Sequence, residues 1–263
     1  MSTRAYVLIL CLLIIVVTLG GFLYAFVASS RAPEVQNAPP RLIPNTDVNP
    51  YGANFFLARE VEEWKLEKTI KMAKEAGIGW VKQHFPWEEI EPRSKGEFVD
   101  PVSKESSWKK YDDIVDLCQK YGLQVIARLD RPPVWSHGDT IHPQRPPTDF
   151  EDYGDFVYSF VERYRGRIRY VQIWNEPNIF PEWGNRPVDP AEYVELLKVA
   201  YRRVKEADPN VYVLSAPLAI TLGQRAPEPG KWTAMNDLQF LEEMYQAGAK
   251  DYFDILSANA FGL

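Results

Sequence analysis

The segment of residues 169–178, RYVQIWNEPN, carries the side chains best suited to chemistry. An apolar run delivers Asn175 and Glu176 to its end, and Pro177 stops regular structure there. The apolar ring of Trp174 beside Glu176 favours a raised carboxyl pKa, which a general acid needs. Glycosidic cleavage uses such an acid with a second carboxylate, and a neighbouring amide can bind a sugar 2-hydroxyl. The alternative is an Asn-Glu-Pro turn without a chemical role.

The elements that would position this segment alternate along the chain from residue 51 onward. Short apolar runs predict strands, and apolar residues repeated every three or four positions predict helices, several of them ending at a glycine. The predicted strands are residues 51–56, 78–85, 123–129, 169–174, 211–215 and 253–258, and the predicted helices are residues 61–76, 108–121, 150–164, 191–207 and 237–247. Six strands joined by five helices imply an α/β fold with a parallel sheet.

A (β/α)8 TIM barrel and a doubly wound sheet both produce this alternation. We favour the barrel because the loops after the second to fifth strands are long and rich in Trp and Pro. Barrels build their active sites from loops at the carboxyl ends of strands. No glycine-rich phosphate-binding motif follows the first strand, so nucleotide binding is poorly supported. Eight such units need more chain than residues 51–263 supply, so we expect an incomplete barrel with about six strands.

Several segments resemble clan A of the glycoside hydrolases, close to families 5 and 39, which are (β/α)8 barrels. The second strand and its loop are matched by AGIGWVKQHFPWEEIEPRSKGEF. The next helix and strand are matched by YDDIVDLCQKYGLQVIARL, and the loop after them by RPPVW. The acid/base motif is matched by WNEPN, and the sixth strand by FDILSANAFG. The resemblance covers residues 51–263. Its WNEPN motif is specific for the clan but does not select one family within the clan. It implies retaining hydrolysis of O-glycosidic bonds in a β-linked oligo- or polysaccharide, without a cofactor.

The same resemblance assigns roles to individual residues. Glu176 is expected to be the general acid/base and Asn175 its substrate-binding neighbour. Trp87 and Trp135 fall on loops that line the family's cleft and are expected to stack on sugar rings, with loop packing as the alternative. His84, at the end of the second strand, is expected to reach the substrate, with a buried structural histidine as the alternative.

The sequence also departs from the family pattern. Lys82 stands where the second strand often has an arginine, and Asn259 and Phe261 stand where the sixth strand often has a His-x-Tyr pair. We keep Asn259 as a candidate substrate contact and attribute Asp130 to the turn that it starts. The clan's nucleophilic glutamate ends strand 7, which would follow residue 263. Because this chain alone lacks an identifiable nucleophile, a non-catalytic glycan-binding surface protein or an inactive barrel fragment is the alternative function.

The N-terminal part of the chain has a different composition. Residues 5–28 are almost wholly apolar and long enough for one transmembrane helix. We therefore expect a signal anchor over residues 1–28, a proline-rich linker over residues 29–50 and an extracytoplasmic barrel over residues 51–263. Cleavage after residue 28 would instead give a secreted protein.

The composition excludes some other classes of function. A net charge of −6 gives no sign of a nucleic-acid partner, which usually requires a clustered excess of Lys and Arg. Hydrophobic residues at 46% and charged residues at 25% are typical of a globular protein. The two cysteines and three histidines lack the spacing of a metal site, so we expect no metal.

Overall fold

The computed structural model describes residues 17–21, 48–60 and 62–260. The chain divides into two compact units, Met1–Val48 and Asn49–Leu263. In the first unit residues 17–21 are helical. Within the described ranges, no helix has the length and apolar character needed to cross a membrane. Apart from residues 17–21 and 48–50, the expected transmembrane span and linker lie outside the described residues.

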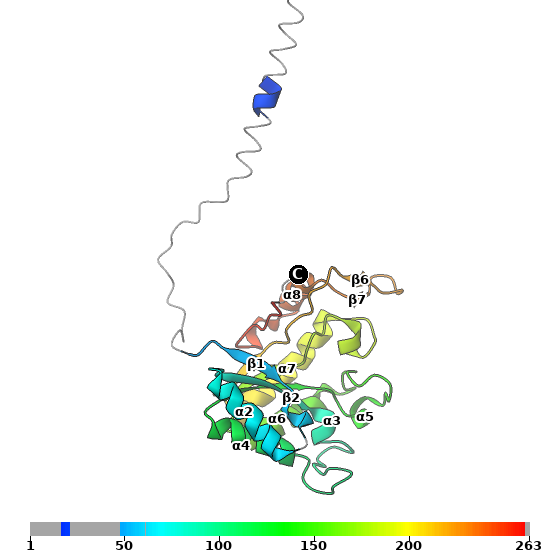
Figure 1. Cartoon of the computed structure of the whole chain (residues 1–263). Helices are drawn as coiled ribbons and strands as arrows, with labels where there is room; N and C mark the ends of the chain where they lie inside the picture. The colour runs from blue at the N-terminus through cyan, green and yellow to red at the C-terminus, as the bar shows by residue number, and fades with distance from the viewer. Residues whose placement is uncertain (1–16, 22–47, 61, 261–263) are drawn as a thin grey trace, which may run out of the picture. The chain divides into compact units, whose positions relative to one another are not determined.

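The second unit is built on a parallel sheet whose five strands lie side by side in chain order. Figure 1 labels the first two of them. Its strands are β1 (Gly52–Phe55), β2 (Trp80–Pro86), β3 (Gln124–Asp130), β4 (Tyr170–Ile173) and β5 (Tyr212–Leu214). The register places His84, Arg128, Gln172 and Leu214 at one level across β2 to β5. Side chains on neighbouring strands therefore meet near the carboxyl end of the sheet.

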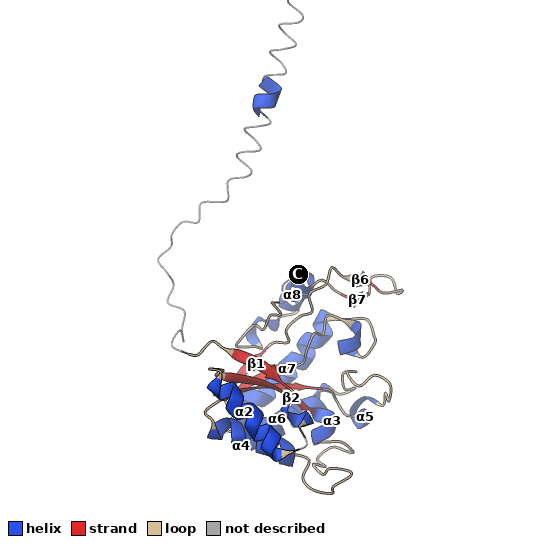
Figure 2. Cartoon of the chain, viewed as in Figure 1, coloured by secondary structure: helices blue, strands red, loops and turns tan. Residues whose placement is uncertain are grey.

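The connections between the strands are helical, as Figure 2 shows. The longer helices are α2 (Glu63–Glu75), α4 (Lys109–Lys120), α6 (Phe150–Arg163), α7 (Pro190–Ala207) and α8 (Asp237–Gln246). The shorter pieces are η1 (Leu57–Arg59), α3 (Trp87–Ile90), α5 (Val134–His137), η2 (Phe180–Trp183) and η3 (Ala249–Asp251). A small antiparallel hairpin, β6 (Gln224–Arg225) and β7 (Trp232–Ala234), follows β5. The sequence analysis did not predict this hairpin or the short helices.

Successive helices pack against one another on one side of the sheet. Contacts join α2 to α4, α6 to α7 and α7 to α8, and an ion pair between Arg163 and Asp112 joins α6 to α4. A doubly wound sheet reverses its strand order and carries helices on both faces. The sequential order of the described strands, with this chain of helices, is instead consistent with part of a TIM barrel.

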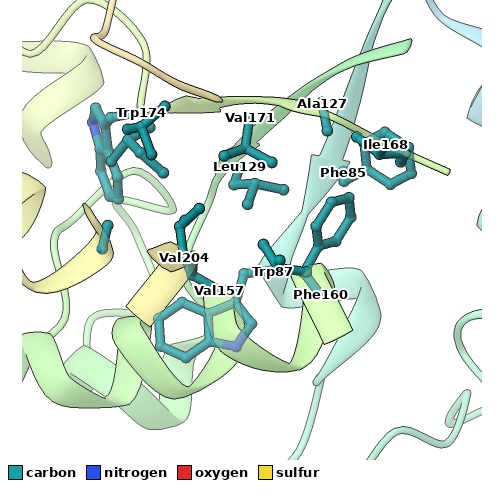
Figure 3. Packing of buried hydrophobic residues seen from close by; sticks show 14 of the residues in the cluster. Phe85, Trp87, Ala127, Leu129, Val157, Phe160, Ile168, Val171, Trp174 and Val204 are labelled. Atoms are coloured by element: carbon teal, nitrogen blue, oxygen red, sulfur yellow. The ribbon is translucent and has the colours of Figure 1, made fainter. Parts of the chain in front are cut away.

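The core lies between the sheet and these helices. Because side chains alternate between the two faces of a strand, Phe85 of β2 and Leu129 of β3 point toward the helices. Figure 3 shows them packed with Val157 and Phe160 of α6, and the rings of Phe85 and Phe160 lie 5.0 Å apart. These side chains are fully buried, so this face of the sheet supplies the main hydrophobic stabilisation.

The expected sixth strand, residues 253–258, is reduced to one parallel bridge between Ile255 and Leu214 of β5. Main-chain hydrogen bonds join Ile255 to Val213 and Ser215, and side chains add to them. The Asp254 carboxylate accepts the N–H of Val213 at 2.7 Å, and the hydroxyl of Ser215 accepts the N–H of Ser257 at 3.1 Å. The segment thus lies next to β5 as expected, but local side-chain hydrogen bonds compete with regular pairing.

Candidate functional site

The loop after β4 holds its residues in unusual backbone conformations. Trp174 and Glu176 have φ values of 72° and 44°, in the left-handed region that non-glycine residues seldom adopt. The N–H of Trp174 donates to the carbonyl of Leu129, and that of Glu176 donates to the carbonyl of Pro217, each at 3.0 Å. Neighbouring strands therefore fix a strained turn, a feature that often accompanies functional sites.

Glu176 and Asn259 lie 83 positions apart in the sequence and meet at this turn. The Nδ2 atom of Asn259 donates to Oε1 of Glu176 at 2.6 Å and to the carbonyl of Leu218 at 3.2 Å. Partial burial raises the pKa of Glu176, while Arg128, Asn259 and Lys82 oppose the rise. Asn259 was expected to contact substrate, and the structure shows that it orients the candidate acid/base. Phe261 lies outside the described residues.

A polar network continues from Glu176 across β3 and β2. Asp130 is only 1% exposed, and its carboxylate contacts Nε2 of His84 and accepts a hydrogen bond from Nε of Arg128 at 2.5 Å. Burial acts to raise the pKa of Asp130, but His84 and Arg128 outweigh it and hold the pKa below its usual value. Burial and the charge of Arg128 lower the pKa of Lys82.

This network changes the interpretation of two residues. The turn alone does not account for Asp130, because its buried carboxylate orients a histidine and an arginine. His84 is half-buried, and its ring is held by Asp130 at the polar face of the sheet. Sequence reasoning missed Arg128, although a charged residue inside the apolar run of β3 was a usable signal.

A buried carboxylate that the sequence analysis did not select lies near the loop after β4. The Oε2 atom of Glu182, in η2, lies 3.8 Å from a guanidinium nitrogen of Arg128 and has no hydrogen-bond partner among the described residues. Burial raises the pKa of Glu182, opposed chiefly by Arg128 and also by the side chain of Asn175. Arg128 therefore acts on both Glu176 and Glu182.

Asn178, the last residue of the WNEPN segment, ties the loop after β4 to the loop after β5. It is fully buried, and its Nδ2 donates to the carbonyls of Ala219 and Met235, each at 2.9 Å. Its Oδ1 accepts the N–H of Ala219 at 2.8 Å. Both polar atoms of this buried amide therefore make hydrogen bonds that hold the two loops together.

Of the two tryptophans expected to stack on sugars, Trp87 lies in the core and Trp135 is partly exposed. Trp87 is fully buried, stacks on Phe156 at 5.3 Å, and donates from Nε1 to Glu91 at 2.6 Å. It is a core residue with no ring face available to a sugar, because α3 begins at Trp87 and its ring packs against α6. Trp135 is half-buried, packs edge-on against Trp87, and donates to the carbonyl of Glu91 at 2.8 Å.

The arrangement can supply an acid and an amide donor, but it does not by itself complete a two-carboxylate reaction. Glu176 has the surroundings of a general acid, and Asn175 is held beside it. Arg128 and Lys82 place positive charge near both. No group of three or more His, Cys, Asp or Glu side chains in the described part of the chain could hold a metal ion.

Comparisons with known proteins address the fold. No family model matches the sequence, and no curated protein matches it. A monomeric β-xylosidase from Caulobacter crescentus CB15 matches with 20% identity and a TM-score of 0.55, covering 81% of this chain and 41% of its own. The GH39 enzyme from Xanthomonas axonopodis pv. citri matches with 18% identity and a TM-score of 0.55, covering 81% and 40%. These proteins share the fold of this chain.

A third match is an exo-β-1,4-mannosidase from the Opitutaceae bacterium strain TAV5, with 20% identity, a TM-score of 0.50, and coverage of 64% of this chain and 32% of its own. The expected resemblance to clan A barrels is thereby confirmed at the level of fold. This chain spans less than half the length of the solved structures that it matches. The parallel sheet corresponds to part of such a barrel.

Proposed function

We propose that this chain is part of a glycoside hydrolase that cleaves O-glycosidic bonds of a β-linked glycan by a retaining mechanism. The observation that carries the proposal is Glu176, held at the carboxyl end of β4 by Asn259, with a pKa raised by burial. The protonated carboxyl would donate to the leaving oxygen. In the second step the same group, now ionised, would take a proton from water.

Two opposing influences on Glu176 suit it to both steps. Burial favours the protonated form that donates, whereas Arg128, Asn259 and Lys82 favour the ionised form that accepts. Asn175, the neighbour of Glu176 in the sequence, would bind the sugar 2-hydroxyl, a contact that strengthens in the transition state. These residues therefore cover the acid/base half of the reaction.

The other half requires a nucleophile. A retaining enzyme places its second carboxylate about 5–5.5 Å from the acid/base. We propose that this carboxylate is a glutamate at the end of the seventh strand of the barrel, which is not the hairpin strand β7 and is not among the described residues. The proposal is supported by the fold shared with the β-xylosidase and the exo-β-1,4-mannosidase.

Substitution of Glu176 by glutamine, in the full-length protein that also carries the seventh barrel strand, tests the acid/base role. Losing the transferable proton should slow hydrolysis of natural glycans, which have poor leaving groups, by about 100- to 10,000-fold. Activated aryl glycosides should be slowed far less, because their leaving groups need little protonation. Glu195→Gln, on the exposed side of α7, is the matched control.

Equal rates for wild type and Glu176→Gln on natural glycans would refute this role. Binding of glycans by the wild type without any hydrolysis would instead support a non-catalytic glycan-binding protein.

We also propose that residues 5–28 anchor the protein in a membrane, with the folded unit extracytoplasmic. The support is the sequence alone, since this apolar run exceeds the roughly 20 residues needed for a span. The protein should then resist extraction from membranes at alkaline pH, and protease added outside intact cells should digest the folded unit. Release of a shortened chain into the medium would show that the segment is cleaved.

A further inference from the structure

The pairing between β4 and β5 changes character just before the loop that carries Glu176. In a parallel ladder the main-chain hydrogen bonds are evenly spaced, so that every second residue of a strand repeats the pattern. The N–H of Tyr212 donates to the carbonyl of Arg169 at 2.8 Å. Continued in the same register, the ladder would next join the N–H of Ala216 to the carbonyl of Ile173.

A hydroxyl group from α7 occupies the place of this bond. The N–H of Ala216 donates to Oη of Tyr193 at 2.8 Å, and Oη of Tyr193 donates to the carbonyl of Ile173 at 3.0 Å. The Tyr193 ring is fully buried, and burial raises its pKa, so the hydroxyl keeps the proton that it donates. The side chain thus separates the ends of β4 and β5 while satisfying both buried main-chain groups.

The start of α7 fixes the position of Tyr193. The carboxylate of Asp189 accepts the N–H groups of Ala191 and Glu192, at 3.0 and 3.1 Å, and so caps the first turn of the helix. Tyr193 lies in this turn, and its ring packs edge-on against Trp183, with 6.1 Å between the ring centres. The hydroxyl is therefore held at the strand ends by its helix as well as by its own hydrogen bonds.

The inserted hydroxyl lies directly before the two backbone attachments of the candidate acid/base. Ile173 is followed by the strained turn that contains Glu176. Ala216 is followed by Pro217, whose carbonyl accepts the N–H of Glu176 at 3.0 Å. The separation of Ile173 and Ala216 therefore sets the position of both attachments, and a direct bond between these residues would move the turn.

We propose that Tyr193 is a positioning residue for the candidate acid/base. By spacing the ends of β4 and β5, its hydroxyl fixes the place from which Glu176 transfers a proton to the leaving oxygen. This inference rests on the proposed function, and it adds a residue that acts on catalysis without touching the substrate. A displacement of about 1 Å at a reacting group can slow a reaction roughly 100-fold.

Tyr153 of α6 provides a matched comparison. It is fully buried like Tyr193, and its hydroxyl donates to the carbonyl of Leu129, near the end of β3, at 2.7 Å. The main-chain bond between strands is kept there, because the same carbonyl also accepts the N–H of Trp174 at 3.0 Å. Replacing Tyr153 by phenylalanine therefore removes a buried hydroxyl without removing a link between strands.

The test compares Tyr193→Phe with Tyr153→Phe in the full-length protein that also carries the seventh barrel strand. Because the proton donor is displaced, Tyr193→Phe should lower kcat on natural glycans about 10- to 100-fold with KM nearly unchanged. Activated aryl glycosides should be slowed far less, which is the pattern expected of Glu176→Gln. Tyr153→Phe should change both rates by less than about threefold.

Combining Tyr193→Phe with Glu176→Gln separates a positioning role from a merely structural one. If Tyr193 acts through Glu176, the double variant should hydrolyse natural glycans no more than about threefold more slowly than Glu176→Gln alone. Equal losses on natural and activated substrates in Tyr193→Phe would overturn the positioning role, and so would an additive loss in the double variant.

The amide ¹H NMR signal of Glu176 gives a readout that does not depend on hydrolysis. It reports the hydrogen bond to Pro217 and should shift more in Tyr193→Phe than in Tyr153→Phe. An unchanged signal in Tyr193→Phe, with hydrolysis that still depends on Glu176, would refute this inference alone. A shifted signal, with hydrolysis that does not depend on Glu176, would refute the catalytic proposal alone.

Discussion

The two faces of the sheet have opposite characters, although the same strands form both. On the helix side, Phe85 and Leu129 are fully buried among apolar side chains. On the other side, the neighbouring residues His84 and Arg128 are half-buried and joined through Asp130. Side chains alternate along a strand, so one residue of sequence separates the core from the candidate chemistry.

This difference shows how the fold can stabilise a polar site. Burying ionised groups costs free energy unless they are paired and hydrogen-bonded. The close-packed helix side keeps the backbone rigid, and the polar side then needs only enough pairing to satisfy its own groups. Substitutions on the two faces should therefore have different consequences.

The largest expected effect on stability is on the helix side. Phe85→Ala removes a fully buried ring and should lower the free energy of unfolding by about 3–5 kcal/mol, as measured by urea denaturation. Phe56→Ala removes the same ring from an exposed position and should cost less than about 0.5 kcal/mol. Similar losses for the two variants would contradict the contrast between the buried and exposed positions.

A smaller effect is expected for Asp130→Asn on the polar side. Loss of charged hydrogen bonds to His84 and Arg128 should cost about 1.5–3 kcal/mol at neutral pH. Because the folded-state pKa of Asp130 is depressed, its contribution is present above the unfolded pKa of about 3.9 and is lost as pH falls through the folded value. The difference between the two unfolding curves should stay nearly constant from pH 7 to about pH 4 and shrink only as the pH falls further, and a difference that persists unchanged at lower pH would contradict this.

Asn259→Ala should alter the pH profile more than the fold. Asn259 donates to the ionised form of Glu176, so its loss should raise the pKa of Glu176 further. A general acid works protonated, and the basic limb of kcat/KM should therefore move to higher pH. Asn210→Ala, at an exposed turn, serves as the control. A basic limb that stays in place or moves to lower pH would count against Glu176 as the acid.

The smallest expected effect is a gain in stability for Glu176→Gln. Burial disfavours the ionised carboxylate, so the wild type loses stability as pH rises above the unfolded glutamate pKa of about 4.3. The variant lacks this loss and should become relatively more stable from pH 4 to pH 7 in thermal unfolding. A relative loss over the same range would show that the hydrogen bond from Asn259 and the nearby positive charges dominate.

Much of the fold could be predicted because its signals are local. The five longer helices, α2, α4, α6, α7 and α8, follow apolar repeats, and Gly77 and Gly122, with φ values of 83° and 66°, adopt the left-handed conformation expected just past α2 and α4. The sixth strand was overestimated, since residues 253–258 pair with β5 through a few main-chain hydrogen bonds near Ile255 and through the side chains of Asp254 and Ser215. The competition between side chain and backbone depends on tertiary structure.

The site was only partly predictable for the same reason. Glu176 and Asn175 stand in a motif, whereas Arg128 and Glu182 belong to the site only through contacts across strands and loops. Trp87 shows the opposite error. An aromatic residue just after a strand can face either the site or the core, and only the start of α3 at that residue directs it inward.

The sequential order of the five strands also has a consequence for synthesis on the ribosome. Each strand pairs with the one made immediately before it, and each intervening helix can dock as soon as its strand is in place. The ribosome adds about 5–20 residues per second, so the strands emerge one after another over several seconds. Nascent β1 and β2 can therefore pair before β5 is translated, and Glu176 leaves the ribosome well before Asn259, the residue that orients it.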